Sequence, residues 1–277
     1  MLRSILVGLD GSCYSRVAVE LGIDWAKRCD ALLVGVAVVD EPTIRGPEAV
    51  PIGGGAYKRQ RDEKRLAEAR SKVEQFLESF RARCTEAGVA CHVLEDIGLP
   101  SREILRESPR YDLVLFGRET HFHFETQDRA DETLRCVLRH ETRPVAVAPR
   151  EVRGGTSVVV AYNGRPSADR ALQAFEASGL DYGEEIHLVT VDADHSQAAC
   201  AAEKAADFLR FHGIHAQTRR CEPAGSVAQT ILEEVRKRDA RLLVMGAYRH
   251  SSLRESLFGS VTKDVLRDSR VPVFLCS

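Results

Sequence analysis

The chain has 277 residues, of which 44% are hydrophobic and 29% are charged, and its formal net charge is −2. This length is sufficient for two domains of ordinary size. The near-neutral charge disfavours a dedicated nucleic-acid surface, and no stretch approaches the roughly 20 apolar residues of a membrane helix. The apolar run at the amino terminus is too short for a signal peptide. We therefore expect a cytoplasmic protein without nucleic-acid or membrane partners.

The first half of the chain alternates apolar runs with charged stretches. The runs SILVGL, ALLVGVAVV, ACHVLE, DLVLFG and PVAVAP are mostly continuous, which is typical of strands buried on both faces of a parallel sheet. The Pro- and Gly-rich segment 41–60 is predicted to be a long loop. Apolar residues at helical spacing predict a helix over 61–87. These residues are Leu66, Val73, Leu77 and Phe80.

The second half repeats the first. ILVGLDGS near the start matches VVVAYNGR, so Asp10 pairs with Asn163. GLPSREIL matches GSVAQTIL, DLVLFG matches RLLVMG, and both halves close with a Pro-Val strand. The repeat predicts two α/β domains in tandem, 1–150 and 155–277, each a doubly wound parallel sheet. Such a sheet binds ligands outside the carboxyl ends of its strands.

A glycine-rich pattern near the end of the second domain has the features of an anion site. Gly246 ends an apolar run, and the last predicted helix opens with Gly259, Ser260, Val261 and Thr262. Glycine lets backbone N–H groups approach a ligand, and the first turn of a helix leaves its N–H donors unpaired. The hydroxyl groups of Ser260 and Thr262 add donors at the same place. The pattern predicts a phosphate-binding site.

The segment around this site resembles the ATP loop of the universal stress protein family, G-x2-G-x9-G-[ST], and the similarity extends over nearly the whole chain. Gly246, Gly259 and Ser260 fit the pattern, whereas Arg249 stands at the position of the second glycine. The resemblance implies that the protein binds ATP, with or without Mg²⁺, or AMP or ADP instead. Arg249, supported by His250, either donates to the phosphates or fills their space.

The resemblance also implies where the rest of the nucleotide lies. Asn163, preceded by Ala161 and Tyr162, is expected to face the ribose or the adenine, and the backbone around Val191 to meet the adenine edge. The strands that close the two copies are expected to pair within one chain. Two such chains are expected to form a homodimer.

The first copy differs from the second at the phosphate loop. Asp131 and Glu132 align with Gly259 and Ser260, and carboxylates there would cap the helix and repel a polyphosphate. The first copy is therefore predicted to have lost its phosphate site. The HFHF segment at 121–124 is interpreted as loop packing rather than a metal site, because no further Cys or His lies nearby at ligand spacing.

No catalytic set emerges from the sequence, which has no GKS or GKT phosphate loop, no GxSxG turn and no HExxH. We predict a stress-response protein that binds a nucleotide through its second domain and acts by a conformational or partner-binding change. Two alternatives stay open. One is a nucleotide-free interaction module, and the other is a slow ATPase or nucleotide transferase.

Overall fold

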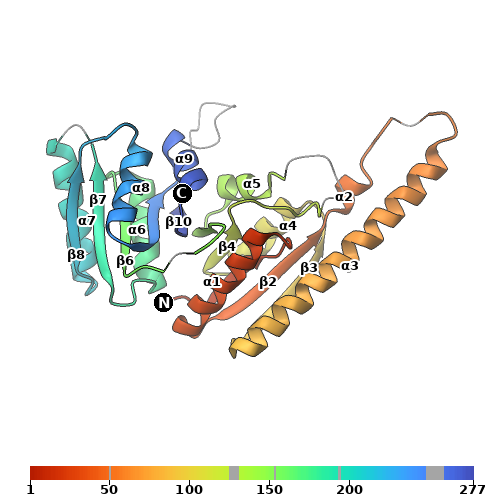
Figure 1. Ribbon diagram of the computed structural model, residues 1–277, viewed down its shortest axis with the longest axis horizontal. Coiled ribbons are helices and arrows are strands. Elements are labelled where there is room, and N and C mark those ends of the chain that lie inside the picture. Colours follow the sequence, from red (N-terminus) through yellow and green to blue (C-terminus); the bar gives the residue numbers. More distant parts are fainter. Residues whose placement is uncertain (50, 125–130, 153, 193–194, 248–258) are drawn as a thin grey trace.

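The computed structural model describes the chain except for residues 50, 125–130, 153, 193–194 and 248–258. Its strands form one ten-stranded sheet in the order β3-β2-β1-β4-β5-β10-β9-β6-β7-β8 (Figure 1). The predicted strands of the first copy are confirmed. The strands are β1 (Ser4–Gly8), β2 (Leu32–Val39), β3 (Cys91–Ile97), β4 (Leu113–Gly117), β5 (Val145–Ala148), β6 (Ser157–Ala161), β7 (Glu185–Val191), β8 (Ala216–Cys221), β9 (Ala240–Gly246) and β10 (Val273–Cys276).

The two copies have the same topology and meet at a seam between their closing strands. Within each copy all neighbouring strands are parallel, with β1 between β2 and β4, and β6 between β7 and β9. At the seam, β10 pairs antiparallel with β5, and Phe274 lies opposite Ala146. The prediction that the closing strands pair within one chain is confirmed.

Helices cover both faces of the sheet, as expected for a doubly wound fold. Buried residues of α1, α3, α6 and α7 form one core that spans both copies, and those of α4, α5, α8 and α9 form a second core on the other face. The helices are α1 (Cys13–Cys29), α2 (Glu41–Ile44), α3 (Gly55–Ala87), α4 (Pro100–Glu107), α5 (Thr133–His140), α6 (Pro166–Ser178), α7 (His195–Phe211), α8 (Val227–Lys237) and α9 (Ser260–Asp268), with a 3₁₀ turn at Ser108–Arg110.

The insertion of the first copy contains helix at both ends, so the prediction of a loop over 41–60 is wrong there. The Asp40 carboxylate accepts the N–H of Thr43 at 3.1 Å and starts α2. The helix α3 starts at Gly55, earlier than predicted, and an ion pair between Lys58 and Asp62 supports its first turns. Its four predicted apolar residues are all buried.

The two edges of the sheet carry opposite charges. The edge strand β3 includes Glu95 and Asp96, and the edge strand β8 includes Arg219 and Arg220. Glu95 and both arginines are exposed. Among the helices that the structure describes, none combines the length and the apolarity that crossing a bilayer requires.

Candidate nucleotide-binding site

A cavity of about 580 Å³ opens at the carboxyl ends of β6 and β7, with α6 and α7 as its walls. Its volume lies within the range of small-molecule sites. Tyr162, Asn163 and Val191 line it, so three of the predicted residues come together. Ala161 is the last residue of β6 and directly precedes the lining residues. The position agrees with the rule that doubly wound sheets bind ligands outside the carboxyl ends of their strands.

The lining residues at the end of β6 have defined hydrogen bonds. The Tyr162 hydroxyl donates to the Asp169 carboxylate, and burial together with this carboxylate raises the pKa of Tyr162. The Asn163 side-chain oxygen accepts the N–H of Arg165 at 3.2 Å, in a turn that Gly164 completes with a φ of +70°. The amide NH₂ of Asn163 can then donate to a ligand.

Thr190 is a lining residue that sequence reasoning missed. Its side chain is only 2% exposed, and among the described residues its hydroxyl has no hydrogen-bond partner. Leaving a buried hydroxyl unpaired is costly, and a polar ligand atom offsets that cost. The sheet register places Ala37 at the equivalent position of the first copy. Aligning the second strands of the two copies would have revealed this difference.

Gly246 lies at the end of β9 but does not line the cavity. A Cβ atom at this position would come within 2.6 Å of the backbone nitrogen of Ala168, at the start of α6. Gly117 of the first copy has the same role, because a Cβ there would lie 2.5 Å from Tyr14. Glycine at both positions therefore allows close packing of strand and helix, independently of any phosphate.

The first turn of α9 has the features expected of an anion site. Gly259 is the N-cap, and no described side chain accepts a hydrogen bond from this turn. Ser260 is exposed and Val261 is half-buried, whereas Thr262 is only 2% exposed and so packs inward. The helix α9 ends near the amino end of β10, which is parallel to β9. The start of α9 therefore lies on the opposite side, at the carboxyl ends of the strands, where the cavity opens.

Two predicted residues of the phosphate loop, Arg249 and His250, lie outside the residues that the structure describes.

The equivalent space in the first copy is filled by a phenylalanine. The helices α3 and α7 can be aligned by a backbone hydrogen bond that both make at their ends. The N–H of Val89 donates to the carbonyl of Cys84, and the N–H of Ile214 donates to that of Leu209. In this alignment Phe76 of α3 is the counterpart of Ala201 of α7. The Phe76 ring lies against Gly11, where an added Cβ would be 2.1 Å from it. Ala201 meets Gly164 in the same way but leaves the cavity open.

The HFHF segment closes this filled space. The ring of Phe124 packs edge-on against Phe76, with centroids 5.4 Å apart. The N–H of His121 donates to the Asp10 carboxylate at 2.7 Å, and the His123 Nδ1 lies 3.0 Å from Asp40. Burial raises the pKa of Asp10, although its hydrogen bonds oppose that effect. Asp10 is therefore engaged by its own chain, and these contacts agree with the interpretation of the segment as loop packing.

The start of α5 is occupied by a carboxylate from its own copy. Asp131 accepts the N–H of Thr133 at 2.7 Å and also that of Phe122. The predicted cap is therefore confirmed for Asp131, whereas the side chain of Glu132, the N-cap residue, makes no capping hydrogen bond. An anion approaching this helix would meet a negative charge that already binds the N–H of Thr133.

The comparisons with known proteins agree with this organisation. A sequence model of the universal stress protein family matches residues 1–149 and 156–277. The chain belongs to the universal stress protein family. The two matches correspond to the two copies that the repeat predicts.

Relatives with the same tandem length are known. Universal stress protein Slr1230 from Synechocystis is 23% identical over 98% of this chain and 99% of its own. The crystal structure of a universal stress protein from Archaeoglobus fulgidus matches with a TM-score of 0.71 and 22% identity, covering 99% of this chain and 98% of its own. At 22% identity, this structural similarity supports the fold alone.

Proposed function

We propose that this universal stress protein binds one adenine nucleotide per chain, in its second copy, and acts in the stress response as a nucleotide-dependent regulator. The observation that carries the proposal is the cavity beside Asn163 and Thr190, open in the second copy and filled by Phe76 in the first. ATP is the proposed ligand. AMP and ADP use the same adenine contacts and are outcomes of the binding test.

The polar groups around the cavity suit the parts of a nucleotide. Asn163 and Thr190 offer donors and acceptors for the base or the ribose. Lys204 also lines the cavity and contributes a positive charge. The first turn of α9, with Gly259 and Ser260, suits the phosphates because its N–H groups are not capped by a described side chain. Mg²⁺, where present, would neutralise phosphate charge.

Calorimetric titration of the full chain with ATP tests the proposal. We expect one site per chain. The variant Gly259→Asp should remove it, because the second copy would then carry a carboxylate where the first copy has Asp131. Asp is a favourable N-cap, so this variant is expected to fold. Asp10→Asn in the first copy is the control and should leave the affinity unchanged. Two equivalent sites, or no binding at all, would contradict the proposal.

Arg249→Gly decides between the two roles open to this arginine. If its guanidinium contacts phosphate, the variant should lose about 1.5–3 kcal/mol of ATP binding, roughly 10- to 100-fold in affinity, with little change for adenosine. If the arginine fills the phosphate space, the variant should bind ATP more tightly. Parallel titrations with ATP and adenosine distinguish the two.

The alternative functions make different predictions for the same samples. A nucleotide-free interaction module would bind neither ATP nor AMP, and a slow ATPase or nucleotide transferase would release ADP or AMP during a long incubation. Homodimer formation by the tandem chain stays a prediction, which sedimentation equilibrium tests.

A further inference from the structure

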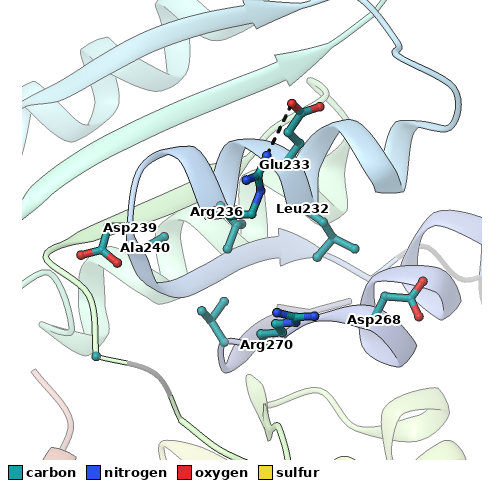
Figure 2. Close-up of a pocket in the computed structure, with 10 residues that line it drawn as sticks. Leu232, Glu233, Arg236, Asp239, Ala240, Asp268 and Arg270 are labelled. Atoms are coloured by element: carbon teal, nitrogen blue, oxygen red, sulfur yellow. Dashed lines mark ion pairs between the residues drawn. The ribbon is translucent and has the colours of Figure 1, made fainter.

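A second cavity, of about 420 Å³, lies at the opposite edge of the sheet from the nucleotide site. It is bounded by α8 and by the turn that joins α9 to β10 (Figure 2), and Gly154 of the inter-copy linker also lines it. Ala240 begins β9 and Val271 precedes β10, so the cavity faces the amino ends of these strands. It therefore shares no lining residue with the cavity at the carboxyl ends.

The first copy bridges the same place with one of its own side chains. The carbonyl of Pro144 accepts a backbone N–H from β4, and the carbonyl of Pro272 accepts the equivalent N–H from β9. The residues that precede these prolines, Arg143 and Val271, are therefore counterparts. The Arg143 guanidinium donates to the carbonyl of Pro109, just beyond α4, at 2.7 Å. Val271 is too short to reach across, and the space stays open.

The lining combines an apolar floor with cationic walls. Arg236 lies on α8 with its guanidinium turned toward Glu233, and Arg270 lies on the facing turn (Figure 2). Among the described residues Arg270 has no carboxylate partner, and Arg236 has only a 3.9 Å contact with Glu233. The floor consists of Leu232, Val235, Ala240 and Val271.

Three carboxylates also reach the rim, but they do not cancel this pair of arginines. Glu233 lies 3.0 Å from Lys237, and Asp268 lies 2.7 Å from Arg267, so each is neutralised by a cation outside the cavity lining. Asp239 lies at the linker end, away from Arg270 in Figure 2.

We propose that this cavity binds a small organic anion with a compact apolar body, of the aromatic carboxylate class. The apolar body would cover the floor, and the carboxylate would accept hydrogen bonds from Arg236 and Arg270, in the manner of other guanidinium–carboxylate pairs. The cavity volume suits a ligand of this size.

Titration of the full chain with phenylacetate, followed by amide NMR shifts, tests this proposal, with phenylacetamide as the neutral counterpart. We expect saturable shifts at the cavity and at least about tenfold weaker binding of phenylacetamide, because a charge-assisted contact is lost. Val271→Arg, which installs the residue of the first copy, should weaken phenylacetate about tenfold or more.

Arg270→Gln is a second variant that does not depend on repacking, since the side chain is exposed, and it should weaken phenylacetate by about tenfold. Arg219→Gln on β8 is its matched control and should change nothing. Equal binding of phenylacetamide, unchanged affinity in both cavity variants, or absence of saturation at millimolar phenylacetate would each overturn the proposal. None of these results bears on ATP binding in the other cavity.

Discussion

The two copies share strand order, register and seam, yet the second has an open cavity where Phe76 and Phe124 fill the first. Phe76 lies on Gly11 in the first copy, and Ala201 lies on Gly164 in the second. Nearby, the first copy packs a large residue, Phe80, on a small one, Gly35. The second copy has the reverse at the equivalent positions, Ala205 and Leu188, so the total side-chain volume is conserved there. The change at Phe76 has no such compensation. A duplicated fold can therefore gain or lose a binding cavity through a few side chains while its core packing is kept.

Ala201→Phe is the most direct test of the difference between the open cavity and the filled one. The added ring should occupy the second cavity as Phe76 occupies the first, and nucleotide binding should fall below detection in calorimetric titration. Glu203→Phe adds the same ring to an exposed position of α7 and should leave binding intact. Retained affinity in Ala201→Phe would show that the nucleotide lies elsewhere.

Phe124→Ala opens the filled site from its other side. The Phe124 side chain is 4% exposed, so truncation should lower the free energy of unfolding by about 3 kcal/mol. Phe211→Ala removes the same atoms from a residue that is 77% exposed and should cost less than about 0.5 kcal/mol. Urea unfolding measures both. Similar values for the two variants would mean that the HFHF segment does not seal the first copy.

Asp131→Ala tests the cap on α5, for which we expect the smallest effect on the free energy of unfolding. Two backbone N–H groups lose their acceptor, and we expect a loss of about 1 kcal/mol together with faster amide exchange at Phe122 and Thr133. Glu132→Ala is the control, because among the described residues the Glu132 side chain makes an exposed ion pair with Arg135 and no capping hydrogen bond. Unchanged exchange in Asp131→Ala would argue against the cap.

Much of this architecture was predictable because repetition and apolar runs encode it locally. The strands and the cap at Asp131 followed from short motifs, and the pairing of the closing strands followed from the resemblance to the family. The loop predicted over 41–60 failed because Pro and Gly mark helix starts as well as loops, and Pro42 and Gly55 lie in the first turns of α2 and α3.

Other features depend on tertiary contacts that no short motif records. The role of Ala201 becomes visible only when α3 and α7 are aligned through the strands that follow them. The unpaired hydroxyl of Thr190 likewise requires knowing which face of β7 meets the helices. Gly246 matched a phosphate motif, yet its contacts are with the backbone of α6.

The charged edges of the sheet restrict how whole chains can associate. Because the closing strands lie at an internal seam, β3 and β8 are the edges of the sheet in the part of the chain that the structure describes. A twofold dimer that joined like edges would bring Glu95 toward the Glu95 of the second chain, or Arg219 toward its Arg219, whereas Asp96 and Arg220 are already paired with Arg106 and Glu203. Like charges facing each other across paired strands are destabilising. The charges on β3 and β8 therefore disfavour a dimer that extends the sheet through two like edges.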